Sequence, residues 1–230
     1  MARDLSSDEV RAEHLHKLGP ELGAVYHELS EDFSWLVVKW GQYQKLFGTS
    51  PKRIDLLNSA ASFFFYMVET TLWEDVLLHL SRLTDRVQVM GKRTLTIQSL
   101  PKLCSDQALR DQLTKLVDHA IAATGFARDW RNRQIAHRDL DLALKGNVQP
   151  FEAASRARVK EAVKAIHAVM NKISEHCLGS QLDEDVIEPL SDGENLLYVI
   201  RDGVEAKAAR MERLEKGCPT PEDLRHRPID

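Results

Sequence analysis

The sequence has few of the residues on which β-rich folds and cross-linked folds depend. Only eleven glycines and eight prolines occur in 230 residues, which is few for an all-β chain with many turns. The three cysteines are odd in number, far apart and without a CxxC pair: Cys104, Cys177 and Cys218. This pattern fits reduced thiols in a cytosolic protein better than disulfides or a zinc site.

Long apolar runs and an excess of positive charge are also missing. The longest apolar stretches, such as FFFYMV at 63–68, are far too short to span a bilayer. The N-terminal MARDLSSDEV is polar and acidic, unlike a signal peptide, so we expect a cytoplasmic protein with no membrane partner. The net charge of -4 gives no general attraction to nucleic acid, so any binding of RNA or phosphate must come from a local patch.

Apolar residues instead recur at steps of three and four along nearly every long segment, which is typical of amphipathic helices. No segment has the alternation of a convincing strand. Ser6 and Glu9 have the spacing of a capping box for a short leading helix. Four long helices are predicted at about 22–47, 51–85, 105–138 and 150–179, and a last helix is predicted to be capped by Ser191.

These elements predict an all-α fold, an up-and-down antiparallel helical bundle of four long helices plus a C-terminal helix. The chain is long enough for one well-buried core and short for two. We therefore expect the bundle to occupy residues 1–180, with its core at about 20–178. Residues 181–230 should hold an acidic linker, the C-terminal helix and the tail.

Several familiar catalytic and metal-binding motifs are absent from the sequence. It has no glycine-rich phosphate loop, no GxSxG, no HExxH, and one ExxH where a carboxylate-bridged metal bundle would need a pair. We expect no metal site and no cofactor. The pairs His14/His16 and Asp75/His79 are interpreted as solvated or hydrogen-bonded helix faces. The tryptophans are assigned to the core: Trp35, Trp40, Trp73 and Trp130.

The stretch DWRNRQIAHRDL, at 129–140, carries the strongest candidate site. Its Arg131-to-His137 spacing has no weight alone, because chance predicts as many such pairs as the sequence contains. The other pair, Arg11 and His16, lies in a short charged segment. Arg131 and His137 instead end a long predicted core helix beside Trp130, which can hold polar groups in place.

These residue types suit RNA cleavage without a metal. A histidine at a helix C-terminus favours its charged form and can transfer protons, and arginine offers a fork for phosphate oxygens. His137 would assist attack of the 2′-hydroxyl, Arg131 would stabilise the charged phosphorane, and Asn132 would orient the scissile group. One histidine cannot easily be both base and acid, which favours a two-fold dimer with two such helices face to face. A purely structural Arg/Asp/His network that caps the helix and pins the following loop stays open.

The same stretch resembles the signature helix of HEPN domains, in which an arginine and a polar residue are followed by a histidine after four to six positions. RNRQIAHRDL, the upstream LWEDVLLHLSRLTDR (72–86) and LTIQSLP (95–101) resemble the AbiU-like branch, named for bacterial abortive-infection proteins, over roughly residues 20–178. The resemblance implies a helical bundle, a dimer that joins two signature helices, and often metal-independent endoribonuclease activity in toxins or anti-phage defence.

Carried over by position, the resemblance makes Arg131, Asn132 and His137 the catalytic residues. Arg133 and Arg138 are our own assignment as substrate-binding phosphate contacts. The expected partners are a second copy of the chain and an RNA substrate, and a cognate antitoxin is a further candidate. The alternative is a non-catalytic helical HEPN module that binds a protein partner or a nucleotide.

Overall fold

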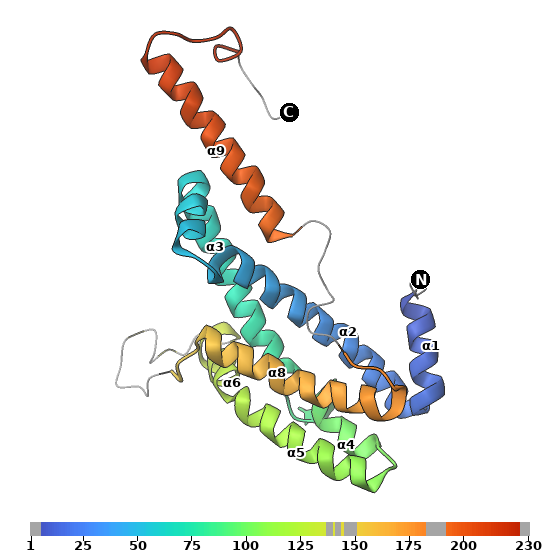
Figure 1. Cartoon of the computed structure of the whole chain (residues 1–230). Coiled ribbons are helices and arrows are strands. Elements are labelled where there is room, and N and C mark those ends of the chain that lie inside the picture. Colours follow the sequence, from blue (N-terminus) through green and yellow to red (C-terminus); the bar gives the residue numbers. More distant parts are fainter. Residues whose placement is uncertain (1–5, 137–139, 141–143, 145–150, 183–191, 226–230) are drawn as a thin grey trace. The chain divides into compact units, whose positions relative to one another are not determined.

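The computed structural model describes residues 6–136, 140, 144, 151–182 and 192–225 of the chain. The protein is all-α, as predicted, and almost everything described is helical (Figure 1). The helices of this part are α1 (Ser7–Leu18), α2 (Pro20–Tyr43), α3 (Pro51–Leu83), α4 (Leu100–Leu103), α5 (Gln107–Ala123), α6 (Gly125–Trp130), α8 (Arg156–Ile173) and α9 (Gly193–Glu215). Shorter π- or 3-10-helical turns are η1 (Gln44–Gly48), η2 (Ile97–Ser99), η3 (Arg131–Ile135) and η4 (Ser174–Leu178). None of these helices is long and apolar enough to cross a membrane.

The chain divides into two compact units, each built from two separate stretches. Unit 1 comprises residues 1–41 and 71–188, and unit 2 comprises residues 42–70 and 189–230. The candidate site lies in unit 1. The up-and-down arrangement of four long helices and the domain boundary near residue 180 stay predictions.

The apolar stripe predicted along residues 22–47 is confirmed in full, since all of its members are buried. They are Leu22, Tyr26, Leu29, Phe33, Leu36, Trp40, Tyr43 and Phe47. In unit 1, α8 runs back along α5 and packs against it (Figure 1). The Tyr26 hydroxyl donates a hydrogen bond of 3.2 Å to the Met170 carbonyl and so ties α2 to α8 inside the core.

Helix starts follow the capping residues, and three of them differ from the predicted ones. The Ser6–Glu9 capping box is present. Asp106 caps α5 instead of the preceding Ser105, because its carboxylate accepts the Leu109 N–H at 2.8 Å. The described residues 151–155 are not helical, and α8 begins at Arg156 with Ser155 as its cap, later than the predicted start of the fourth long helix. Asp192 caps α9, while the predicted cap, Ser191, lies outside the described part.

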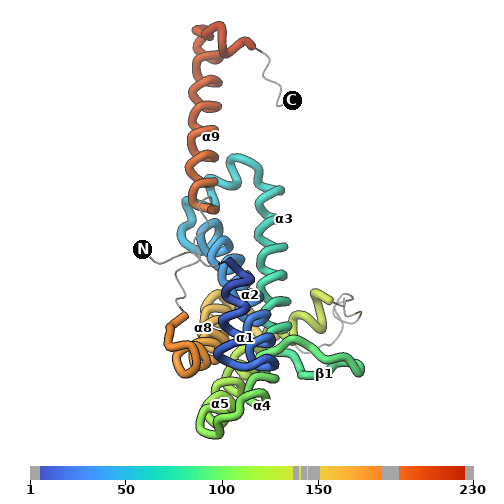
Figure 2. The backbone as a smooth tube through the Cα atoms, turned by 90° about the vertical axis from the view of Figure 1, so that its right-hand side faces the viewer, coloured from blue at the N-terminus to red at the C-terminus, as the bar shows by residue number. Residues whose placement is uncertain are grey.

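Two local features were not predicted. Ala61 has φ -161° and ψ 75°, which is extended backbone, so α3 is interrupted there and a new helical segment begins at Ser62. Residues 86–93 contain a hairpin of β1 (Gln88–Val89) and β2 (Lys92–Arg93), which follows α3 (Figure 2). Met90 and Gly91 both have positive φ in its turn, as a tight two-residue hairpin requires. Strands of two residues are too short to show an alternating pattern.

Unit 2 joins the start of α9 to η1 and to the first segment of α3. Lys45 pairs with Asp192 at 2.5 Å, and Arg53 pairs with Glu194 at 2.8 Å. The N–H of Gly193 donates to the Gln42 side chain at 2.6 Å. These contacts fix the first turn of α9, and beyond it most of the helix is exposed.

Candidate active site

The stretch DWRNRQIAHRDL passes from α6 into a π-helical turn and does not continue as a regular α-helix. The predicted long helix is divided into α5 and α6, and Arg131 then opens η3, in which the Ala136 N–H donates to the Arg131 carbonyl at 2.8 Å. This i-to-i+5 bond adds a residue to the turn, so angles calculated for a regular α-helix do not apply here. Such π-turns are frequent at functional sites.

Two neighbours hold the Arg131 side chain. Its guanidinium forms an ion pair with Asp85, which lies two residues after the end of α3. Its Nε donates to the Asn132 side-chain oxygen at 3.0 Å. Only 22% of the Arg131 side chain is exposed, so the guanidinium has a defined position, and the two residues assigned to phosphate chemistry touch each other.

Further arginines gather around Asp85. The Arg128 guanidinium donates to the Thr84 carbonyl at 3.0 Å and to its hydroxyl at 3.2 Å. Burial lowers the pKa of Arg128, the charges of Arg131 and Arg86 lower it further, and Asp85 opposes them. The charges of Arg131, Arg86 and Asp85 thus all act on the Arg128 guanidinium. The local charge is positive although the chain as a whole is acidic, and this is the kind of patch that phosphate binding requires.

The next part of the stretch is built into a packing network. Arg133 pairs with Asp129 at 3.4 Å, one helical turn earlier, and its guanidinium lies 4.7 Å from the centre of the Phe151 ring. Phe151 also stacks on Trp130 at 4.6 Å. Asp129 accepts the Glu152 N–H at 3.2 Å, and the Trp130 indole donates to the Glu152 carbonyl at 2.9 Å. These contacts hold residues 151–152 against the helix end.

The other predicted site residues, His137 and Arg138, lie outside the described residues. The approach of His137 to Arg131 therefore stays a prediction, and so does a phosphate contact by Arg133 or Arg138. Among the residues that the structure describes, no group of three or more His, Cys, Asp and Glu side chains could hold a metal ion.

A sequence model of the family described as AbiU2, a branch of HEPN, matches residues 19–196. This chain belongs to the AbiU2 family. It therefore contains an HEPN domain related to abortive infection. The match begins at the break between α1 and α2 and extends into the first turn of α9, further than the predicted resemblance over residues 20–178. Comparisons with curated proteins and with solved structures give no match.

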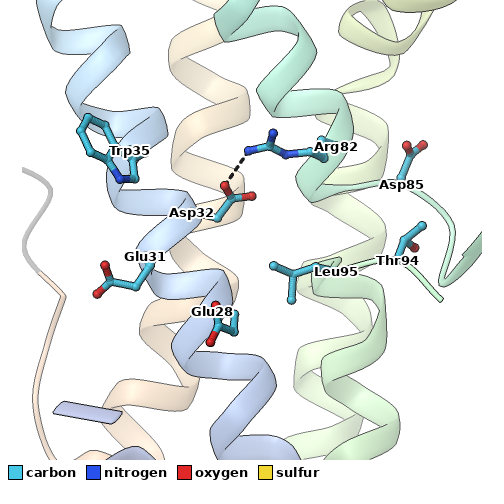
Figure 3. Close-up of a pocket in the computed structure, with 8 residues that line it drawn as sticks. All are labelled: Glu28, Glu31, Asp32, Trp35, Arg82, Asp85, Thr94 and Leu95. Carbon is cyan, nitrogen blue, oxygen red and sulfur yellow. Dashed lines mark hydrogen bonds and ion pairs between the residues drawn. The ribbon is translucent and has the colours of Figure 1, made fainter. Parts of the chain in front are cut away.

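A cleft of about 500 Å³ lies beside the site in this HEPN domain (Figure 3). It is lined by Glu28, Glu31, Asp32, Trp35, Arg82, Asp85, Thr94 and Leu95. Four of these side chains are carboxylates and one is an arginine, so the cleft repels phosphate. Asp85 belongs both to its wall and to the Arg131 ion pair, and it marks the border between an acidic surface and a basic one.

Asp32 is the best anchored carboxylate of the cleft. It accepts from Arg82 at 2.5 Å and lies 3.1 Å from Nε2 of the buried His79 (Figure 3 draws the Arg82 contact). Burial opposes the ionisation of Asp32, but His79 and Arg82 outweigh it and lower its pKa. His79 therefore pairs across helices and not with Asp75, which pairs with Lys39 at 2.6 Å.

Two further predictions about single residues were wrong. Trp35 is 61% exposed and lines the cleft, so it is not part of the core. His14 is not on a solvated face, because its ring is buried against Tyr26 and His27. The site residues that sequence reasoning missed are Asp85, Arg86 and Arg128. Asp85 and Arg86 end the LTDR segment on which the family resemblance partly rests, but their spacing in the sequence carries no signal of contact with Arg131.

Proposed function

We propose that this HEPN domain is a metal-independent endoribonuclease of a toxin or of anti-phage defence, acting as a homodimer with a composite Arg/His active site. The observation that carries the proposal is the position of Arg131. It is fixed by Asp85 and Asn132 among three guanidiniums, on a π-helical turn that leads directly to His137.

In the proposed reaction the 2′-hydroxyl of the RNA attacks the adjacent phosphorus. His137 of one protomer takes the hydroxyl proton, and Arg131 stabilises the extra negative charge of the phosphorane. The bond to the 5′-oxygen then breaks, and that oxygen takes a proton from the second protomer's copy of His137. The products are a 2′,3′-cyclic phosphate and a 5′-hydroxyl. Asp85 holds the Arg131 guanidinium in position, and the remaining N–H donors of Arg131 can bind phosphate oxygens.

The test is incubation of purified protein with total RNA in EDTA. We expect wild type to cleave, and His137→Ala and Arg131→Ala to lose at least about 100-fold in rate, the usual scale for losing a general acid–base or a charge-stabilising group. Arg11→Ala and His16→Ala are matched controls, because they remove the same residue types from the other Arg/His pair of the sequence, and both should cleave normally.

The competing function is a non-catalytic HEPN module, which the Asp129–Arg133–Phe151 network favours because it gives the stretch a structural role. It predicts intact RNA with wild type and His137→Ala alike, in preparations confirmed as dimers by sedimentation. His137→Ala would then lower the melting temperature or the affinity for a protein or nucleotide. That outcome would end the enzymatic proposal.

A further inference from the structure

The second helical segment of α3 begins in unit 2 with an exposed apolar face. Its exposed fractions are 72% for Phe63, 55% for Phe64, 64% for Tyr66 and 45% for Met67, and we call these four residues the aromatic patch. At about 100° per residue they fall within an arc of about 160° on the helix. Phe65 points the opposite way and is buried. The patch is therefore one continuous side of the helix.

One ring of the aromatic patch, Phe64, is held in place by a buried neighbour. The Phe64 ring packs edge-on against the buried Phe65 ring, with centres 5.3 Å apart and planes at 82°. Phe65 in turn belongs to the core of unit 2. A partner that docks here therefore orders few additional side chains, and this lowers the entropy cost of binding.

Unit 2 exposes more large apolar side chains than it buries, among its described residues. The buried ones are Tyr43, Leu46, Phe47, Leu57, Phe65 and Leu197. The exposed ones are the aromatic patch together with Leu196, Tyr198, Val199, Met211 and Leu224. Exposed apolar side chains scattered singly are normal, but four on one helix face mark an interaction surface.

The size of the patch agrees with the apolar core of a stable interface. An aromatic side chain offers about 150–250 Å², so the exposed fractions of the three rings amount to roughly 400 Å². A standard interface buries about 800 Å² on each partner, of which somewhat more than half is apolar. The aromatic patch thus supplies most of the apolar area that one side of such an interface needs.

The absence of charged residues around the aromatic patch indicates which kind of partner binds there. Residues 58–68, NSAASFFFYMV, carry no charge, whereas 29% of the whole chain is charged. In a two-fold symmetric contact the same surface meets itself near the axis, so any charge there would face its own copy. An uncharged aromatic surface avoids that repulsion, and it offers no charge by which to attract or orient a different protein.

We propose that a second copy of this chain docks on the aromatic patch, which makes the patch a self-association surface of unit 2. This contact goes beyond the proposed function, which concerns the Arg131 region of unit 1. Phe63 and Tyr66 are the most exposed of the four and lie one turn apart, so they are the residues on which the contact depends most.

The test is the association of full-length protein, measured by sedimentation velocity over a series of concentrations. The double variant Phe63→Asp with Tyr66→Asp should raise the concentration of half-association about 100-fold or more, the scale expected for removing two aromatic anchors. The neutral pair Phe63→Ser with Tyr66→Ser should weaken association in the same direction. Circular dichroism and thermal melting verify that both variants fold.

Met90→Asp is the matched control, because Met90 is an exposed apolar residue in the hairpin turn of unit 1, and it should associate as wild type does. Association that is unchanged in both double variants would overturn the proposal. So would a wild-type chain that stays monomeric at every concentration, which would assign the patch to a different protein. The His137→Ala cleavage assay reports separately on the proposed function.

Discussion

At the scale of single residues, His14 shows how burial acts on a titratable group. Its ring lies 5.1 Å from the Tyr26 ring and 5.5 Å from the His27 ring, both edge-on. Its Nδ1 is buried and accepts or donates no hydrogen bond within the described residues. Burial lowers the pKa of His14, and the neighbouring His27 lowers it further. The other charges that act on it are Glu13, Glu31 and Lys17.

This lowered pKa makes stability depend on pH in a defined direction. Above the ordinary histidine pKa of about 6.5 both states are neutral at His14, and below it the unfolded chain takes up a proton that the folded chain refuses. The contribution of the buried, neutral His14 to stability is therefore fully present above pH 6.5, and it is lost as the pH decreases below that value. We expect the melting temperature of wild type to fall between pH 7.5 and 5.5 by about 2–4 °C for each kcal/mol lost, and the fall should be smaller in His14→Leu.

His16→Leu is the control for that comparison, because His16 lies on the same helix and is exposed. It should keep the pH dependence of wild type. If His14→Leu and wild type show equal melting-temperature changes over this pH range, burial of His14 does not couple folding to protonation.

Arg131 and Asn132 could be singled out from the sequence, but the residues that hold Arg131 in place could not. Arg131 and Asn132 stand out because their types suit phosphate chemistry and because a core helix precedes them. Asp85 contacts Arg131 across 46 positions of sequence, and Arg128 reaches back to Thr84. No local pattern encodes such contacts, since they depend on how the end of α3 meets η3 in space. The negative charge of the cleft is also a tertiary property, because its carboxylates come from α2 and from Asp85, beyond the end of α3.

At the scale of helices, the contact between α1 and α2 depends on a close backbone approach at Gly23. A Cβ atom built there would lie 2.5 Å from the His14 carbonyl oxygen and 2.8 Å from the Leu15 Cα. These are backbone atoms of α1, which cannot move aside as a flexible side chain could. Glycine is therefore required at this position for packing, although it is unfavourable inside a helix.

We expect Gly23→Ala to destabilise the protein by about 1–3 kcal/mol, as forced overpacking does. Gly41→Ala is the matched control on the same helix, because a Cβ there meets nothing within 4 Å. That variant should be neutral or stabilised by up to about 1 kcal/mol through better helix propensity. Urea unfolding of the two variants measures both effects, and equal stabilities would contradict the close approach.

Helix existence was predictable from periodicity, and helix ends were less so. The stripe along α2 and the apolar face of α8 are buried as predicted. The starts of α5, α8 and α9 shifted because Asp or Ser residues stand near several candidate positions, and any of them can cap a helix. The extended residue Ala61 has no signature at all, since alanine is the best helix former.

At the scale of the molecule, the proposed RNA binding must work against a net charge of -4. Among the described residues, Arg86, Arg128 and Arg131 are the positive charges that act around Asp85, so this group neutralises few phosphates. Affinity for single-stranded nucleic acid falls with salt at a slope of about -0.7 per phosphate contact on logarithmic axes. With up to three contacts for each protomer, the proposed dimer should show a slope of roughly -4.

To measure this slope, the affinity of His137→Ala for an oligoribonucleotide is determined at salt concentrations from about 50 to about 300 mM. Adding Arg86→Gln should reduce the slope by about 0.7 for each protomer. Arg201→Gln is the control, because Arg201 is exposed in unit 2 and pairs with Asp202, and it should leave the slope unchanged. A slope far steeper than predicted would show that RNA covers other parts of the surface.

The interruption of α3 has a consequence for how the chain tolerates insertions and deletions. In an unbroken α-helix an added residue rotates everything after it by about 100°, which would turn an apolar stripe away from its core. The extended backbone at Ala61 ends that dependence between the two segments. Changes of length before Ala61 can therefore alter unit 2 without rotating Val76, Leu80 and Leu83 out of the core of unit 1, and without moving Asp85 away from Arg131.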